Sequence, residues 1–107
     1  MAWTVSFLDE RVEAEMEDQH RDIRARFDRV RQLITEHGPA ALPPRYVKHI
    51  KERVWELRMR GKDGIARAFY VPPTGQRVVI VRVFTKKTQR TPRREIELAL
   101  KRAEEIA

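Results

Sequence analysis

The residues best suited to chemistry in this sequence are basic, and they fall on one face of a predicted β-sheet. In the segment VWELRMR (54–60), large apolar residues alternate with charged ones as in a half-buried strand, which turns Arg58 and Arg60 away from the core. The same alternation over 65–71 and 77–86 extends this face, provided that no β-bulge interrupts a strand. The predicted set comprises Arg58, Arg60, Arg67, Phe69, Arg82, Phe84 and Lys86.

A face of this composition suits RNA. Guanidinium groups bind phosphate with two parallel hydrogen bonds, and exposed aromatic rings stack on unpaired bases. The alternative is a solvated basic face on which Phe69 and Phe84 fill gaps in the core. The alternation by itself does not choose between these two interpretations.

The stretch FTKKTQRTP (84–92) joins the last strand of this face to a helix and adds cations to its rim. Lys86 and Lys87 stand at the end of the strand. Thr91 and Pro92 fit the N-cap and the first position of the helix. Two arginines in the first turn oppose the helix dipole, which is locally unfavourable unless an anion binds there.

A proton-transfer group is harder to identify than the cations. Arginine stays protonated in proteins, so it stabilises charge but cannot act as a base. Glu56 has the chemistry of a base and by parity lies beside Arg58, although an ion pair with a neighbouring arginine is its more common role. Lys86 qualifies only if nearby cations lower its pKa. His49 is a weaker alternative, as the one histidine near these segments.

Apolar spacing and turn residues predict an α+β fold that positions this face. A strand at 3–7 precedes a helix pair or one bent helix, with Asp9 as N-cap and Gly38 as C-cap. Three strands in a meander and a C-terminal helix follow. The expected order is β-α(α)-β-β-β-α, with the helices packed on one face of the sheet and the other face free.

Composition narrows the class of protein further. The 107 residues suffice for one domain spanning 1–107, and the absence of cysteine excludes disulfides and cysteine-built metal sites. No signal peptide and no membrane-spanning apolar run is visible, so a cytoplasmic location is expected. Residues 1–44 carry 6 basic and 9 acidic residues, whereas 45–107 carry 17 and 7. The positive balance of the second part favours a polyanionic partner.

Three runs together resemble the RelE-like toxins of bacterial type II toxin–antitoxin systems, in particular the phage-derived and HigB-like branch. They are KHI-x3-VWELRMR (48–60), GIARAFY (64–70) and VFTKKTQRTP-x2-EIELA (83–99). The last run is the most specific of the three. One departure is Ala66, where the family often has tyrosine.

The resemblance implies a microbial-ribonuclease-like fold and cleavage of mRNA, usually on the ribosome, by attack of the ribose 2′-OH without metal or cofactor. Arg58, Arg67, Lys86 and Lys87 would stabilise the phosphate and position RNA. The other expected RNA contacts are Arg60, Phe69, Tyr70, Arg82 and Phe84. The implied partner is a helix-turn-helix antitoxin, which would contact the acidic N-terminal helices or cover the basic face. A non-catalytic nucleic-acid-binding module and a phage-derived interaction protein are the alternatives.

Overall fold

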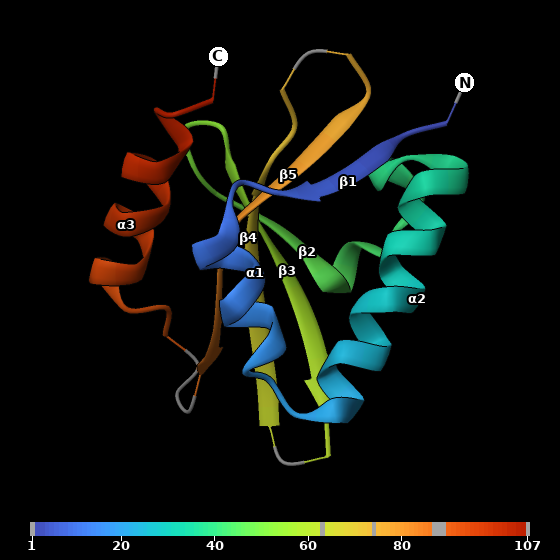
Figure 1. Ribbon diagram of the computed structural model, residues 1–107, viewed down its shortest axis with the longest axis horizontal. Helices are drawn as coiled ribbons and strands as arrows, with labels where there is room; N and C mark the ends of the chain where they lie inside the picture. Colours follow the sequence, from blue (N-terminus) through green and yellow to red (C-terminus); the bar gives the residue numbers. More distant parts are fainter. Residues whose placement is uncertain (1, 63, 74, 87–89, 107) are drawn as a thin grey trace.

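One strand, two helices, four strands and a final helix follow one another in the computed structural model, which describes residues 2–62, 64–73, 75–86 and 90–106 (Figure 1). The first half holds β1 (Thr4–Phe7), α1 (Glu10–Glu17) and α2 (Arg21–His37). After two short 3₁₀ turns come β2 (Val47–Lys51), β3 (Val54–Gly61), β4 (Gly64–Val71), β5 (Arg77–Lys86) and α3 (Arg93–Ala103). The α+β class and the order of elements are thus confirmed, with β2 as an additional strand.

The strands form one sheet in the order β1-β5-β4-β3-β2. Neighbouring strands from β2 to β5 are antiparallel, whereas β1 pairs with β5 in parallel, from Thr4 opposite Arg77 to Phe7 opposite Ile80. The central strand β4 is buried on both sides from Ala66 to Val71. This strand therefore forms the middle of the core and fixes which residues of β3 and β5 lie next to each other.

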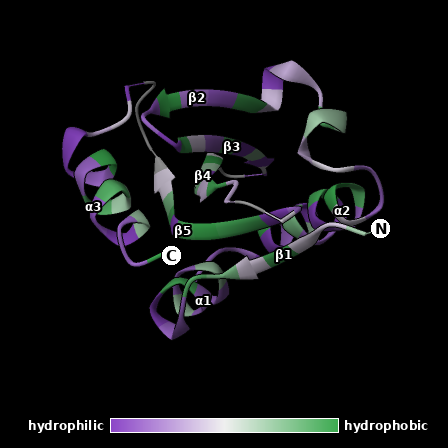
Figure 2. Ribbon diagram, turned by 90° about the horizontal axis from the view of Figure 1, so that it is seen from above, coloured by the Kyte–Doolittle hydropathy of each residue, from purple (hydrophilic) through white to green (hydrophobic). Residues whose placement is uncertain are grey.

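The sheet is covered on both faces rather than on one. Residues such as Leu57, Met59 and Ala68 share a core with α1 and α2, as predicted. α3 instead packs on the opposite face, where Ala99 and Ala103 join Phe69 and others in a second core. Figures 1 and 2 show α3 and α2 on opposite sides of the sheet. The expectation that all helices pack on one face is wrong for α3, because β4 and β5 present apolar residues on both sides.

A β-bulge shifts the register between β4 and β5. Phe69 pairs with Arg82, but the next residue, Tyr70, pairs with Ile80, so Val81 is an extra residue on β5. Val81 consequently lies in the core beneath α3, as does Val79. Unbroken alternation would place both valines on the face opposite Arg82 and Phe84, and the bulge is the physical reason that this expectation is wrong.

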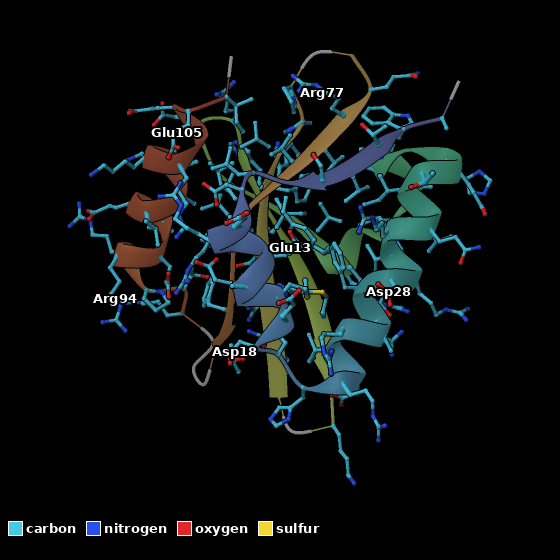
Figure 3. All side chains as sticks on the ribbon, in the orientation of Figure 1. Glu13, Asp18, Asp28, Arg77, Arg94 and Glu105 are labelled. Carbon is cyan, nitrogen blue, oxygen red and sulfur yellow. The ribbon has the colours of Figure 1, made fainter. Side chains whose placement is uncertain are left out.

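The helix pair has the expected ends. The Asp9 side chain accepts hydrogen bonds from the backbone N–H groups of Arg11 and Val12, as an N-cap does. Gly38 ends α2 with φ of 82°, a conformation that favours glycine. α2 buries one stripe of apolar residues, and Asp28 points away from the sheet, as Arg94 does on α3 (Figure 3). No helix in the described ranges is long and apolar enough to cross a membrane.

Side chains from both layers cover the edge of β5 beyond the end of β1. The backbone N–H of Val83 donates to Glu15 Oε1 of α1 at 3.0 Å, and the carbonyl of Val81 accepts from Arg102 of α3 at 2.9 Å. The two side chains also form an ion pair at 2.9 Å. They thus satisfy backbone groups that a neighbouring strand would otherwise pair.

Candidate functional site

Arg58 and Arg67 form the centre of the candidate site, because they lie directly opposite each other on β3 and β4. Two like charges in this position repel each other and destabilise a sheet. Glu56, two residues before Arg58, lies between them: its Oε1 accepts from Arg58 Nε at 3.2 Å and from Arg67 Nη1 at 3.3 Å. One carboxylate therefore holds two guanidinium groups and leaves the cluster with an excess positive charge.

The two arginines differ in their access to solvent. The Arg58 side chain is 41% exposed, whereas that of Arg67 is 6% exposed and lies behind it. Burial lowers the pKa of the Arg67 guanidinium; Glu56 opposes this shift, and the positive charge of Arg58 adds to it. Its Nε is buried and has no hydrogen-bond partner within the described structure. Arg67 therefore retains an unused donor, which is unusual for a buried polar group.

Thr91 is a member of this cluster that the sequence did not reveal. Its hydroxyl donates to Glu56 Oε2 at 3.1 Å, so both oxygens of the carboxylate are engaged. The predicted N-cap role of Thr91 is wrong: Pro92 occupies the cap position, Arg93 is the first helical residue, and no side chain caps α3. The local pattern favours capping, but the hydroxyl donates to a carboxylate 35 residues away in the chain.

Two acid or base candidates have described side chains, Glu56 and His49. Neither is available for proton transfer at the arginines. Glu56 is 1% exposed and fully engaged, so its expected alternative role, an ion pair with a neighbouring arginine, is confirmed. His49 pairs with Trp55, which places it on the α2 side of the sheet and away from Arg58. There its Nε2 lies 2.5 Å from the carbonyl oxygen of Glu52, and its ring contacts Trp55 edge-on.

The two phenyl rings of the predicted face are buried. Phe69 is fully buried and Phe84 is 6% exposed; the rings meet edge-on at 5.2 Å beneath α3. The interpretation that they fill the core is confirmed, and the expectation of exposed rings is wrong.

Arg82 also lies under α3, where it pairs with Glu95 at 2.8 Å and with Glu15 of α1 at 2.8 Å. Arg82 is therefore engaged within the fold.

The remaining predicted residues lie around or away from this cluster. Lys86 occupies the last position of β5, paired with Ile65, and Lys87 falls outside the described residues. Arg60 is exposed on β3, two positions beyond Arg58. Tyr70 lies on the other face, at a hollow of about 370 Å³, where burial raises its pKa to about 12. Arg60 and Lys86 both pair with Ile65 of β4, one from each side; Arg60 shares the sheet face of Arg58, whereas Tyr70 does not.

The arrangement provides positive charge and hydrogen-bond donors around the partly exposed Arg58. Across the described ranges, no group of three or more histidine, cysteine, aspartate or glutamate side chains could hold a metal ion. Clustered guanidinium groups bind phosphate or carboxylate oxygens and stabilise negative charge that develops on a phosphate.

Comparison with protein families identifies the family of this chain. No curated protein matches the sequence. The family model described as "Phage derived protein Gp49-like (DUF891)" matches residues 14–104, which include α2, the four antiparallel strands and α3, and leave out only β1 and the start of α1 among the elements. Because the match covers most of the chain and all residues of the arginine cluster, the protein belongs to the phage-derived Gp49-like family.

Proposed function

We propose that this protein is the toxin of a type II toxin–antitoxin system and cleaves mRNA as an endoribonuclease on the ribosome. The observation that carries the proposal is the pair Arg58 and Arg67, held opposite each other by Glu56 with an unused buried donor on Arg67. The RelE-like resemblance of the motifs and membership of a phage-derived family support it. The order of elements is also consistent with a RelE-like fold.

The proposed chemistry needs charge stabilisation more than any other contribution. When a ribose 2′-OH attacks the adjacent phosphorus, the P–O5′ bond breaks and leaves a 2′,3′-cyclic phosphate and a 5′-hydroxyl. The pentacoordinate intermediate carries additional negative charge on its oxygens. Arg58 would donate to these oxygens from the solvent side, and Arg67 would add positive charge from behind. Because Glu56 already fixes both side chains, little reorganisation is needed when RNA binds.

Proton transfer is assigned to the lysine end of β5 under this proposal. Glu56 is engaged and His49 lies on the other face, so Lys86 and Lys87 are the remaining candidates from the motif. The engaged state of Glu56 and the position of His49 also favour a second candidate function, a non-catalytic RNA-binding module. Such a module would use Arg58 and Arg67 for phosphate and would lack a base. The two functions differ in a single measurable result, which is whether RNA is cut.

The test is cleavage of a defined mRNA by the purified protein, with and without ribosomes. We expect fragments with 2′,3′-cyclic phosphate and 5′-hydroxyl ends, and growth arrest when the protein is induced in bacteria. Loss of one transition-state donor costs about 10²- to 10³-fold in rate, so Arg58→Ala should lower cleavage by that factor. Arg67→Ala should lower it at least as much.

Arg24→Ala is the matched control, because Arg24 is an exposed arginine on α2 outside the cluster. It removes the same charge and should cut RNA like the wild type. Salt-dependent RNA binding without fragments, even on ribosomes, would establish the binding module instead. A protein that neither binds RNA nor slows growth would contradict both functions. The proposed antitoxin is tested separately, by co-expressing a helix-turn-helix protein encoded beside this gene and measuring relief of growth arrest.

A further inference from the structure

A second cluster of cations lines a hollow between α2 and the turn that joins β3 to β4. The hollow measures about 490 Å³ and is bounded by Asp22, Ala25, Arg26, Arg29, Arg60, Gly61 and Lys62. Figure 1 shows the start of α2 beside the end of β3, where this turn begins. Four of the seven residues are cationic, and one is anionic. The hollow is therefore strongly positive and lies outside the Arg58–Arg67 cluster.

The one carboxylate of the hollow does not neutralise these cations. Asp22 accepts hydrogen bonds from the backbone N–H groups of Lys62 and Ile23, and these bonds, with that of Lys62 the largest cause, lower its pKa. Within the described ranges, no carboxylate lies within ion-pair distance of Arg26, Arg29 or the other two cations. Among the described side chains, these four cations therefore have no carboxylate partner of their own.

Close packing holds the hollow in shape. A Cβ on Gly61 would lie 2.6 Å from Ile23 Cδ1 and 2.8 Å from Asp22 Oδ2, so the first turn of α2 approaches the end of β3 as closely as glycine permits. The pKa of the neighbouring Tyr46 phenol lies below its ordinary value. A hydrogen bond from Arg45 lowers its pKa most, and the charges of Arg45, Arg26 and Arg60 lower it further.

Arg60 connects this hollow to the candidate site. It lies two positions beyond Arg58 on β3, on the same side of the strand. The pairing of β2 with β3 ends at Val47 opposite Leu57. In the described part of the chain, no strand pairs with this edge of β3 beyond Leu57. A chain of phosphates can therefore pass from Arg58 to Arg60 and turn round this edge of β3 to reach α2, which packs on the other face of the sheet.

We propose that the RNA backbone follows this path, and that Arg26 and Arg29 bind its phosphates in the hollow. This inference rests on the proposed action on RNA and adds a binding subsite, not a catalytic one. An acidic protein segment is less suited to the hollow, because Ala25 is its largest apolar side chain and protein interfaces rely on buried apolar and aromatic anchors. Nucleic-acid interfaces are polar and basic, as this one is.

The experiment compares two double variants that remove the same charge from the same helix. Arg26→Ala/Arg29→Ala changes the hollow, whereas Arg21→Ala/Arg24→Ala changes exposed arginines of α2 that do not line it. The probe is a fluorescent single-stranded 2′-O-methyl RNA of 12 nucleotides, which lacks the attacking hydroxyl and so separates binding from cleavage. Fluorescence anisotropy gives the dissociation constant at several salt concentrations.

Loss of two phosphate contacts should reduce the salt slope of log K by about 1.4, at ~0.7 per contact for single strands. A reduction of the slope by this amount corresponds to about 25-fold weaker binding at 0.1 M salt. The Arg21→Ala/Arg24→Ala protein should bind within about 2-fold of the wild type, since neither arginine lines the hollow. The Arg21→Ala/Arg24→Ala protein should also cut mRNA like the wild type, whereas the Arg26→Ala/Arg29→Ala protein should need more mRNA to reach the same rate.

Three outcomes would overturn the inference. Equal binding by the two double variants, with a wild type that binds and cuts RNA, removes the subsite and leaves the proposed function intact. A wild type that neither binds the probe nor cuts mRNA removes both. If the Arg26→Ala/Arg29→Ala protein binds RNA normally but the co-expressed antitoxin no longer neutralises it, the hollow is a protein interface instead.

Discussion

At the scale of single residues, the site depends on the buried carboxylate of Glu56. It accepts hydrogen bonds from Arg58, Arg67 and Thr91, which come from three different elements or connections of the chain. Removing one partner of a buried ion pair leaves the other charge without compensation in a medium of low polarity. Glu56 is therefore a positioning residue, and its loss should affect stability and activity together.

Replacing Glu56 by glutamine should lower the free energy of unfolding by about 3 kcal/mol, because the amide keeps the shape but leaves Arg67 buried without a counter-charge. Urea denaturation at pH 7 measures this loss. The double variant Glu56→Gln/Arg67→Met should recover part of it, because no buried charge then remains unpaired. A single variant within about 0.5 kcal/mol of the wild type would contradict the assignment, since that is the range of neutral surface changes.

The two tyrosines of the chain should titrate separately. Burial raises the pKa of Tyr70 to about 12, whereas Arg45 and its neighbours hold the pKa of Tyr46 below its ordinary value. Because the folded-state pKa of Tyr70 exceeds its unfolded value of ~10, burial of the neutral phenol stabilises the fold fully below pH 10. That contribution is lost as the pH rises from about 10 toward 12.

Absorbance at 295 nm during an alkaline titration measures both phenols. The Tyr46→Phe variant should leave a single transition near pH 12, and Tyr70→Phe should leave only the earlier one. The Tyr70→Phe protein should also lose less stability between pH 10 and 12 than the wild type. A common transition near pH 10 for both phenols would show that Tyr70 is not buried beneath the α2 side of the sheet.

At the scale of elements, the start of α3 is joined to the arginine cluster through Thr91. The helix begins at Arg93 without a side-chain cap, while the hydroxyl of Thr91 donates to Glu56. A residue that would usually stabilise the helix end is therefore used to complete the hydrogen bonds of a buried carboxylate. The connection between β5 and α3 matters for the site as well as for the helix.

Thr91→Asp distinguishes these two roles, because aspartate is a good N-cap but a poor neighbour for Glu56. If the hydroxyl bonds to Glu56, the new carboxylate faces a buried one and the protein should lose about 1 to 3 kcal/mol of stability. Thr91→Ser keeps the donor and serves as the control, with little change expected. An Asp variant as stable as the wild type, measured by urea denaturation, would restore the capping role.

At the scale of the whole molecule, Glu15 links parts of the chain that are far apart in sequence. It accepts from the Val83 N–H, pairs with Arg82 of β5 and pairs with Arg102 of α3. Glu95 completes the group by pairing with Arg82. The two helical layers and the edge of β5 therefore meet in one partly buried set of charges. This set lies toward the edge of the sheet opposite β2.

Glu15→Ala should destabilise the protein by about 3 kcal/mol, because it leaves Arg102 without its carboxylate and the Val83 N–H without an acceptor. Thermal or urea unfolding provides the measurement. Glu13→Ala is the control on the same helix, since Glu13 is exposed (Figure 3) and should change stability by less than about 0.5 kcal/mol. Equal effects of the two substitutions would show that Glu15 does not link the layers.

Local patterns predicted much of this arrangement, and tertiary contacts account for the rest. Alternation identified the face of Arg58 and Arg67 because the register of β3 with β4 is uninterrupted. It could not locate α3, since β5 is apolar on both sides, and it could not show that Glu56 binds Thr91 across 35 residues. Nor did summed charge reveal the hollow: the acidic balance of residues 1–44 resides in α1, whereas α2 has five arginines against three acidic residues.

The extra residue Val81 gives β5 a required length as well as a required composition. Deleting it would restore unbroken alternation and turn either the first or the second half of the strand over. Phe84 and the Lys86 position would then no longer share a face with Val79. Substitutions among the valines of β5 leave this geometry intact, but a one-residue insertion or deletion cannot. Within this strand, the evolution of the family is therefore expected to tolerate changes of side chain far better than changes of length.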